Sequence, residues 1–533
     1  MPIDKKIIQE MHKLNQFVHE NSVEYYHTRP VVVSKSGIVL PSKSRHSFDI
    51  VYDLKDVLFI GAITENPVLL TGGTDIGKTI LAKLMMNGLF GKEEEGWHRL
   101  DFDLDFGKDA YTNVKSDFFH ETGKSLDDLY QLHDWMRLPG FIADELNRTH
   151  AKIAAKALHI IQEKDVTLPN GKREKVGYPI NGNGTTYQYQ VATINEGKDY
   201  AGVFEIDKAL RRRTTIEIPM DIFPSTSFDR LLIQKNGLED IELKNGQNNL
   251  ETVLKIFTAI GRNLSLHPTA EMFVAYLEAF DYCKNSLSGE KGGLDSRNGS
   301  LLHVCTQPVK IAGKSVGDDA GMSCEFIKSF EDDLCAYVRG ITPGISKNLI
   351  SVARGFSMLR ASKFVEMIAG FSEQENQKPL SYIVRNPKIF GDSLKQYTGL
   401  NSGMDEVAKA AVEKYLTNLE VEREDVEAAI GFVGYSKIGI AWPWVITHYQ
   451  GNRYEAVKHF TREALNKFEE GLARPELEKL SDLLDGNVST NGAKGIEDYC
   501  KNENPWLWRV IAPYLKDANS SDMQKKIETL YEA

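Results

Sequence analysis

The spacing of apolar residues divides the chain into two kinds of region. From about Asp53 to Pro219, short apolar runs such as Pro67 to Thr71, Gly140 to Ala143 and Tyr187 to Asn195 alternate with longer stretches at helical spacing. Parallel strands need long crossover connections, and these are commonly helices. The alternation therefore predicts an α/β domain with a parallel sheet between helices. After about Ser225 the pattern is mainly helical.

Two stretches with few apolar residues interrupt the helical part. A Gly/Ser/Lys-rich stretch runs from Ser286 to Gly321 and a polar stretch from Ser372 to Ser402, and we expect both to be surface insertions. At roughly 100 to 200 residues per domain, the length predicts several cores. The predicted boundaries are 1–48 for an N-terminal helix and β-hairpin, 49–222 for the α/β core, 223–438 for a helical lid with insertions, and 439–533 for a helical C-terminal domain.

The N-terminal residues have the pattern of an amphipathic surface helix and not of a signal peptide. The apolar positions are Ile7, Ile8, Met11, Leu14, Phe17 and Val18. Next, Val31 to Val33 and Ile38 to Leu40 flank Ser34 to Gly37, which predicts a short β-hairpin with its turn at these four residues. The longest apolar run, Val57 to Ile63, is far shorter than the roughly 20 residues that cross a bilayer. We expect a cytoplasmic protein with no membrane segment.

Composition and charge exclude several classes of protein. Hydrophobic residues make up 41% and charged residues 26% of the chain, the profile of a soluble globular protein. With 64 Lys+Arg against 75 Asp+Glu, the net charge of -11 excludes attraction of the whole surface to nucleic acid. The five cysteines have no zinc or disulfide spacing and are interpreted as reduced thiols: Cys283, Cys305, Cys324, Cys335 and Cys500.

A glycine-rich segment after the run Val68 to Leu70 matches the phosphate-binding pattern G-x-x-x-x-G-K-[ST]. Its residues are Gly72, Gly73, Thr74, Asp75, Ile76, Gly77, Lys78 and Thr79, followed by Ile80 in an apolar helix to Phe90. Glycines let successive N–H groups point at a phosphate near the positive end of the helix. Lys78 would bridge the β- and γ-phosphates of ATP, and the Thr79 hydroxyl would bind Mg²⁺. A glycine-rich turn without a ligand is the alternative.

A second motif ends in two adjacent carboxylates. The apolar run Leu138 to Ala143 precedes Asp144 and Glu145, at a separation from the glycine-rich segment that suits a neighbouring strand. Asp144 would hold the magnesium shell, and Glu145 would orient and deprotonate the attacking water. Such a pair is often only the start of a helix, where negative charge is favourable. Together with the glycine-rich segment, it predicts a Walker B motif.

The segment Asp144-Glu145-Leu146-Asn147-Arg148 resembles the D-E-[IL]-N-R motif of MoxR-family AAA+ ATPases. In that family the following helix runs into a β-hairpin, and here Ala154 to Val166 precedes an Asn-Gly turn at Asn170-Gly171. Val191 to Asn195 is similar to the family's A-T-x-N strand end. The resemblance covers about Asp53 to Ile438 and is strong as far as Pro219. It implies an AAA+ αβα sandwich with a helical lid.

The resemblance also assigns roles to further residues. Asn195 is the sensor 1 candidate, an amide that can bind the attacking water or the γ-phosphate. Ile206 to Thr214 resembles the A-L-R-R-R-F segment of the related McrB and dynein-like branch, which implies that Arg212 and Arg213 face the ATP of the adjacent subunit. A solvated basic turn is the alternative, and Thr214 replaces the usual Phe.

The lid departs from the family pattern. Where the resemblance implies the sensor 2 arginine, this chain has Gly344, so the role is absent or has moved to Lys347 or Arg354. Residues 439–533 resemble no known segment.

Three functions remain open. The first is a ring, expected to have six subunits, in which ATP hydrolysis remodels a client; the family implies a partner with a von Willebrand factor A domain, or maturation of another complex. The second is a McrB-like nucleic-acid motor gripping a strand with Lys172, Arg173 and Lys175, although Glu174 interrupts this basic run. The third is a switch or scaffold that uses ATP only to assemble.

Overall fold

The computed structural model of the chain describes two compact units. The described residues are 4–21, 31–38, 46–102, 112–114, 129–149, 151–180, 184–196, 211, 213–227, 229–231, 247–267, 270–271, 273–274, 277, 309–311, 314–316, 341–372, 382–383, 387–440 and 442–472. The first unit comprises Met1–Leu264 and Ser351–Leu419, and the second Ser265–Ile350 and Glu420–Ala533. Each unit is therefore built from two separate stretches of sequence. The four domain boundaries given above remain predictions.

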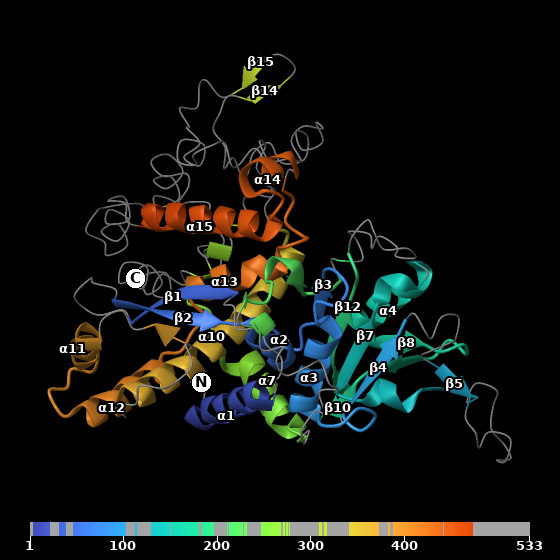
Figure 1. Ribbon diagram of the computed structural model, residues 1–533, viewed down its shortest axis with the longest axis horizontal. Helices are drawn as coiled ribbons and strands as arrows, with labels where there is room; N and C mark the ends of the chain where they lie inside the picture. Colours follow the sequence, from blue (N-terminus) through green and yellow to red (C-terminus); the bar gives the residue numbers. More distant parts are fainter. Residues whose placement is uncertain are drawn as a thin grey trace, which may run out of the picture. The chain divides into compact units, whose positions relative to one another are not determined.

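A five-stranded parallel sheet forms the centre of the first unit (Figure 1). Its strands are β3 (Val68–Thr71), β4 (Trp97–Asp101), β7 (Gly140–Asp144), β12 (Tyr189–Thr193) and β13 (Ile216–Pro219), in the order β13-β3-β12-β7-β4. All four pairings are parallel. The predicted α/β architecture is confirmed, including the three strands expected from the apolar runs.

Helices cover both faces of this sheet. Successive strand residues point to opposite faces, so Phe141 and Ala143 pack with α4 (Ala151–Glu163) in one core cluster. The other face is covered by α3 (Lys78–Phe90). Gly140 leaves room for α3, because a Cβ there would come within 2.8 Å of the Phe90 ring. The result is the predicted αβα sandwich.

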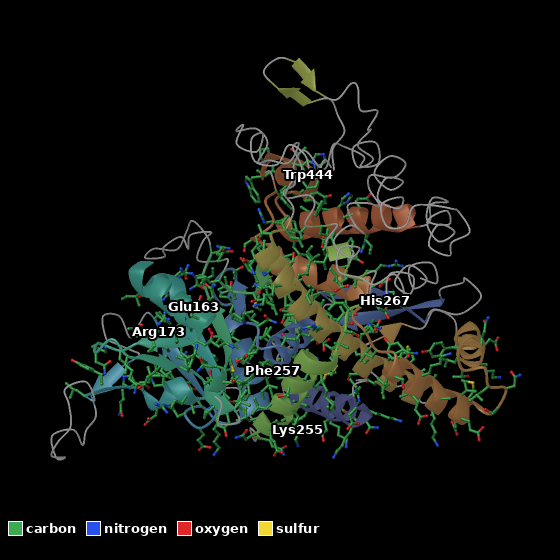
Figure 2. All side chains as sticks on the ribbon, turned by 180° about the vertical axis from the view of Figure 1, so that it is seen from behind. Glu163, Arg173, Lys255, Phe257, His267 and Trp444 are labelled. Atoms are coloured by element: carbon green, nitrogen blue, oxygen red, sulfur yellow. The ribbon has the colours of Figure 1, made fainter. Side chains whose placement is uncertain are left out.

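The N-terminal helix packs onto this core. In α1 (Lys5–Asn21), Ile8, Met11, Leu14 and Val18 are buried, which confirms the predicted amphipathic helix. The helix contacts α2 (Leu54–Ile63), α3 and α7 (Leu250–Asn263). From α7, Phe257 meets the buried ring of Tyr187 edge-on at 5.5 Å (Figure 2).

The predicted hairpin at Ser34 to Gly37 is wrong. These residues continue β1 (Val32–Ile38), which pairs antiparallel with β2 (His46–Tyr52), and β2 also pairs with β16 (Tyr382–Ile383). Ser-Lys-Ser-Gly lacks the Asn-Gly or Asp-Gly pair that favours a tight turn, whereas β2 supplies the buried side chains of Ile50 and Tyr52. The strand that pairs with β1 is therefore β2, and not the residues directly after Gly37.

The polar stretch from Ser372 to Ser402 also has more structure than predicted. It contains β16 and α11 (Pro387–Thr398), which packs against α12 (Met404–Thr417). Among the described side chains of α11, Leu394 is buried, so an apolar contact helps to hold a helix in a mainly polar segment. The first part of α10 (Pro343–Ser372) belongs to the second unit and the rest to the first.

The second unit contains the helices α13 (Arg423–Val433), α14 (Trp442–Tyr449) and α15 (Arg453–Leu472). Gly431 lets α15 approach α13, since a Cβ would lie 2.8 Å from the Tyr454 ring. Trp444 is buried, but Trp442 is 53% exposed. All five cysteines and the segment Pro505 to Trp508 lie outside the described residues.

Several short elements complete the described part. These are β5 (Thr112–Val114), β6 (Tyr130–Leu132), η3 (Asp134–Arg137), η4 (Leu146–Arg148), β8 (Asp165–Thr167), β9 (Arg173–Lys175), β10 (Tyr178–Ile180), β11 (Thr185–Tyr187), η5 (Met220–Ile222), β14 (Val309–Ile311) and β15 (Lys314–Val316). β8 and β9 form the predicted hairpin with its Asn-Gly turn. Among the residues described, no helix combines the length and hydropathy of a membrane span.

Candidate nucleotide site

The glycine-rich segment forms a loop between β3 and α3, as the sequence predicts. Gly72, Asp75 and Gly77 have φ angles of 137°, 60° and 83°, so the loop turns back on itself at left-handed positions. Its end leads into the N-terminus of α3, where free N–H groups and the helix dipole favour an anion. The loop can therefore hold a phosphate group.

Lys78 lies buried at the start of α3 without a carboxylate partner among the described residues. Its ammonium donates to the carbonyl oxygen of Gly72 at 3.0 Å and to that of Gly73. Burial lowers the pKa of Lys78 from its ordinary value, although the charges of Asp221 and Glu145 act in the opposite direction. A buried cation held only by carbonyl dipoles is well suited to an incoming anion.

Asp144 ends β7 and is brought next to Thr79 of α3. The Thr79 hydroxyl donates to Asp144 Oδ1 at 2.8 Å, and Arg99 of β4 donates to Asp144 Oδ2 at 3.2 Å. Thr193 of β12 donates a third hydrogen bond, to Oδ1 at 2.7 Å. A hydroxyl and a carboxylate in contact are oxygen donors of the kind that Mg²⁺ prefers. These two residues therefore fit a magnesium ion on observed geometry.

Glu145 follows in a left-handed conformation, with φ of 53°. Asn195 donates to Glu145 Oε1 at 3.1 Å, and Arg148 pairs with Oε2 at 2.9 Å. The structure thus brings Glu145 and the proposed sensor 1 residue into direct contact.

The order of strands differs from the expectation of neighbouring motif strands. β12 lies between β3 and β7, and it carries Asn195 just beyond its end. The carboxyl ends of parallel strands meet at one edge of a sheet. The middle strand therefore places Asn195 between the loop and Glu145.

Only part of the arginine segment can be placed. Arg212 lies outside the described residues, and Arg213 is half-buried in the turn before β13. Arg211 pairs with Glu217 at 2.7 Å and with Glu196. Burial alone would lower its pKa, but the charge of Glu217 and then that of Glu196 outweigh burial and raise it. Arg211 is thereby engaged within its own subunit.

Sequence reasoning missed four residues at this site. Thr193 lies inside the A-T-x-N segment, and Asn147 and Arg148 lie inside the D-E-L-N-R segment. The motifs therefore marked these residues, but the sequence alone assigned them no role. Arg99 has no motif around it; only the register that sets β4 beside β7 reveals it.

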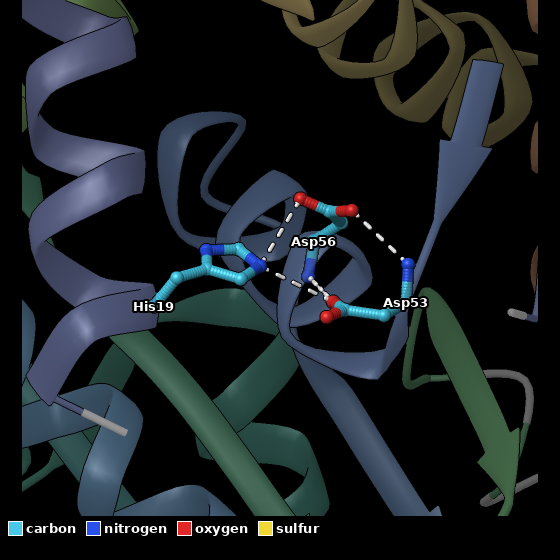
Figure 3. Close-up of side chains that lie close together, drawn as sticks. All are labelled: His19, Asp53 and Asp56. Carbon is cyan, nitrogen blue, oxygen red and sulfur yellow. Dashed lines mark hydrogen bonds and ion pairs between the residues drawn. The ribbon is translucent and has the colours of Figure 1, made fainter. Parts of the chain in front are cut away.

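A second cluster of candidate metal ligands lies between α1 and the start of α2 (Figure 3). His19 Nε2 is 3.3 Å from Asp53 Oδ1 and 3.5 Å from Asp56 Oδ1, and one ligand atom of each residue falls within 4.8 Å of the others. His19 Nδ1 lies 2.8 Å from the carbonyl oxygen of Asn15, which can only accept. Because Nε2 faces carboxylates and Nδ1 faces a carbonyl, these surroundings favour the doubly protonated imidazolium, which has no lone pair for a metal.

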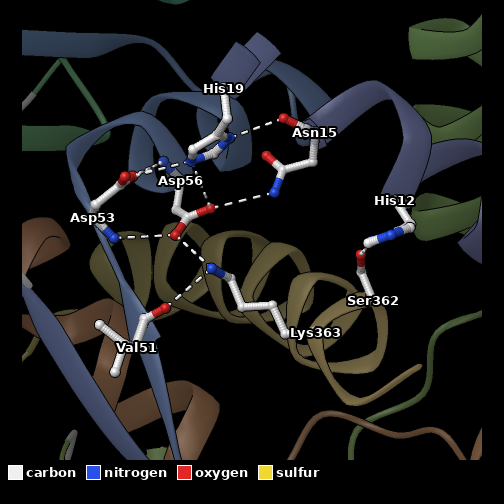
Figure 4. A network of polar contacts seen from close by, with 8 residues as sticks. All are labelled: His12, Asn15, His19, Val51, Asp53, Asp56, Ser362 and Lys363. Atoms are coloured by element: carbon white, nitrogen blue, oxygen red, sulfur yellow. Dashed lines mark hydrogen bonds and ion pairs between the residues drawn. The ribbon is translucent and has the colours of Figure 1, made fainter. Parts of the chain in front are cut away.

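The cluster is closed by a lysine (Figure 4). Lys363 of α10 donates to Asp56 Oδ2 at 2.8 Å and to the Val51 carbonyl oxygen at 3.0 Å. Burial would lower the pKa of His19, but the charge of Asp53 and the hydrogen bond to it outweigh burial and raise it. Burial would raise the pKa of Asp53, yet the His19 charge holds it well below its ordinary value. Two cations balance two carboxylates, so we interpret this cluster as an internal ion-pair network.

Comparisons with known proteins add little. No protein-family model and no curated protein matches the sequence. The fold is similar to the crystal structure of a "putative ATPase" from Cytophaga hutchinsonii, with a TM-score of 0.41 and 14% identity over 77% of this chain and 96% of that chain. A similarity this distant carries no argument about function.

Proposed function

We propose that this chain is a MoxR-like AAA+ ATPase that binds Mg-ATP on the loop of Lys78 and hydrolyses it in a ring of identical subunits. One observation carries the proposal. The Thr79 hydroxyl and the Asp144 carboxylate, 65 positions apart in the sequence, lie 2.8 Å apart, next to a lysine whose hydrogen bonds within the described residues go to carbonyl oxygens. This contact between two separately predicted motifs supports one phosphate and magnesium site.

The roles of the chain's own residues follow from this geometry. Lys78 and the N-terminus of α3 would bind the phosphates, while Thr79 and Asp144 would hold the metal. Magnesium, when bound, would supply charge compensation to the phosphate oxygens. Glu145 would exchange its partner Arg148, whose side chain is 32% exposed, for the attacking water and accept the proton. Asn195 would keep the carboxylate in place.

A neighbouring subunit would supply the remaining charge. Arg99, Arg148 and Arg211 are each engaged with carboxylates in this subunit. On the resemblance of the arginine segment to the dynein-like branch, we assign stabilisation of the transition state to Arg212 and Arg213 of an adjacent copy. Such a contribution is worth roughly 10³ to 10⁵ in rate. Hydrolysis would then require assembly of a ring, which we propose to contain six subunits.

Of the two sensor 2 candidates, Arg354 is favoured. Among the described residues, Arg354 Nε is buried without a hydrogen-bond partner, and burial lowers the pKa of this guanidinium. A buried polar atom without a partner calls for an explanation, and a nucleotide phosphate would provide one.

A protein client is favoured over nucleic acid. At the β8–β9 hairpin, Lys172 lies 3.4 Å from Glu174, and Lys175 lies 3.9 Å from Asp165. Acidic side chains therefore offset part of the positive charge that a nucleic-acid grip would need. The proposed client is a protein, with a von Willebrand factor A domain as the partner that the family implies.

The first test is Mg-dependent ATP hydrolysis by the purified chain across a range of protein concentrations. The specific activity should rise with concentration, because each site needs a neighbour. An Arg212→Ala/Arg213→Ala variant should lose roughly 10³-fold or more in rate while still binding ATP. Lys92→Ala, an exposed lysine just after α3, is the control and should behave like the wild type. Equal turnover in the arginine variant would contradict the proposal.

A second test distinguishes the three functions. Glu145→Gln should bind ATP, hydrolyse it slowly and retain the client during a pull-down. Recovery of nucleic acid alone would favour the motor. Full function of Glu145→Gln in cells would favour an assembly switch.

A further inference from the structure

The ends of β7 and β12 are joined by more than the sheet pairing. Ala192 pairs with Ala143 in the parallel register, so Thr193 of β12 follows at the level where Asp144 of β7 begins the site. Beyond this point the pairing of β7 with β12 ends, although each strand end still pairs with its other neighbour in the sheet. Contacts between the ends of β7 and β12 therefore have to come from side chains.

One buried hydroxyl contacts both members of the carboxylate pair. Thr193 Oγ1 donates to Asp144 Oδ1 at 2.7 Å and accepts the Glu145 backbone N–H at 2.9 Å, and the residue is 1% exposed. A hydroxyl can do both at once because it has one proton and two lone pairs. Valine has the same shape and can do neither.

The bond to the Glu145 N–H matters because of the backbone there. A residue other than glycine in the left-handed region persists only when its surroundings over-determine it. Glu145 has φ of 53°, and this angle sets the direction in which its side chain leaves the strand. Thr193 thus fixes the orientation of Glu145 through the backbone.

A second pair of hydrogen bonds holds Asn195. The Asn147 side chain donates to the Asn195 carbonyl oxygen at 2.6 Å and accepts the Asn195 N–H at 3.1 Å. Both residues are 3% exposed. With its backbone clamped in this way, Asn195 directs its amide to Glu145 Oε1.

We propose that Thr193 and Asn147 are positioning residues for the ATPase proposed above. Thr193 fixes the orientation of Asp144 and Glu145, and Asn147 fixes the backbone of Asn195. Neither needs to touch the nucleotide. The inference rests on the proposed function, and it adds that the register of the β7 and β12 ends controls both the affinity for Mg²⁺ and the rate of hydrolysis.

The test for Thr193 compares Thr193→Val with Thr193→Ser in the purified full chain. Misplacing a catalytic group by about 1 Å costs roughly 10²-fold, so Thr193→Val should lose about that factor in kcat and need several-fold more Mg²⁺ for half-maximal rate. Its affinity for ATP should stay within about twofold, since Lys78 and the loop are unchanged. Thr193→Ser keeps the hydroxyl and should restore the rate to within about threefold of the wild type.

A matched control separates positioning from loss of a buried hydroxyl. Thr461 is fully buried in the second unit, and its hydroxyl donates to the Val457 carbonyl oxygen at 2.8 Å. Thr461→Val should leave kcat and the Mg²⁺ requirement unchanged. The role of Thr193 is overturned if Thr193→Val and Thr193→Ser lower kcat by the same factor. It is also overturned if neither variant changes the Mg²⁺ requirement.

Asn147 is tested by a double-mutant cycle with Asn195. If Asn147 acts through Asn195, Asn147→Ala should lower kcat in the wild type and have little further effect in an Asn195→Ala background. Additive losses would overturn this role. A wild-type chain without Mg-dependent hydrolysis would instead refute the proposed function, and the inference with it; a hydrolysing wild type with an unaffected Thr193→Val refutes the inference alone.

Discussion

The ion-pair network between α1 and the start of α2 and the site around Lys78 use similar residues in opposite ways. In the network, His19 and Lys363 form ion pairs with Asp53 and Asp56, so each of these charges has a partner of opposite sign within the chain. At the other site, the hydrogen bonds of Lys78 within the described part of the chain go to carbonyl oxygens. Both lysines are buried, but only Lys363 has a carboxylate partner.

This difference separates a structural role from the binding role that we propose for Lys78. In a buried set of paired charges, removing one partner is strongly destabilising because it leaves the other uncompensated. A buried charge held by dipoles alone gains most from an external ion of opposite sign. The same substitution at the two lysines should therefore have opposite consequences.

The largest effect on stability is expected for Lys363→Met. It leaves Asp56 buried with one cation fewer, and breaking a buried pair typically costs about 3 to 5 kcal/mol. Hydrogen exchange of the α1 and α2 amides should report the loss locally. Asp56→Asn/Lys363→Met, which removes both charges, should recover part of it. Unchanged protection in the single variant would mean that the network does not hold α1.

Lys78→Met should leave the protection of the α1 and α2 amides nearly unchanged and remove most of the ATPase activity. The Gly72 carbonyl oxygen still accepts the Glu196 N–H at 3.1 Å, so no buried acceptor there is orphaned. Loss of one preorganised donor to the phosphates should lower the rate by roughly 10² to 10³, or about 3 to 4 kcal/mol. Mg-ATP should raise the melting temperature of the wild type and not of the variant. Destabilisation matching that of Lys363→Met would erase the distinction between the two lysines.

Gly72→Ala should have a smaller effect that falls on the site alone. At φ of 137°, an added Cβ would lie 2.6 Å from Ile76 Cδ1 and 2.9 Å from Asp221 Oδ2. The strain should cost about 1 to 3 kcal/mol, seen as weaker ATP binding in calorimetry. Gly171→Ala is the control, because Gly171 has φ of 82° but no atom within 4 Å of an added Cβ. It should bind ATP like the wild type.

The same comparison explains what could be predicted from the sequence. The loop and the carboxylate pair are local patterns next to apolar strands, so Lys78, Thr79, Asp144 and Glu145 could be found and brought together. The network joins Asp56 to a lysine 307 positions away, and no local pattern marks such a pair. Its only sequence signal is the capping box of Asp53 and Asp56 at the start of α2.

The errors at Ser34 to Gly37 and in the polar stretch have the same origin. A strand is defined by its partner, and β1 takes its partner from beyond the residues that looked like a turn. Similarly, α11 packs against α12, a contact that its own residues do not indicate. Arg99 belongs to this class too, since its contact with Asp144 depends on which strands are neighbours.

The smallest expected effect is a pH dependence of stability, which should arise in the ion-pair network and not at the site around Lys78. The pKa of His19 is raised in the folded chain. Its contribution to stability is therefore fully present below the unfolded value of about 6.5 and is lost as the pH rises through the folded pKa. Protection of the α1 amides, corrected for intrinsic exchange, should fall as the pH rises above about 6.5 in the wild type and stay flat in His19→Gln. His98→Gln, which removes a histidine paired with Glu94 outside the network, should keep the wild-type slope. A slope that persists in His19→Gln would show that the charge of His19 does not hold α1 and that the network is closed by Lys363 alone.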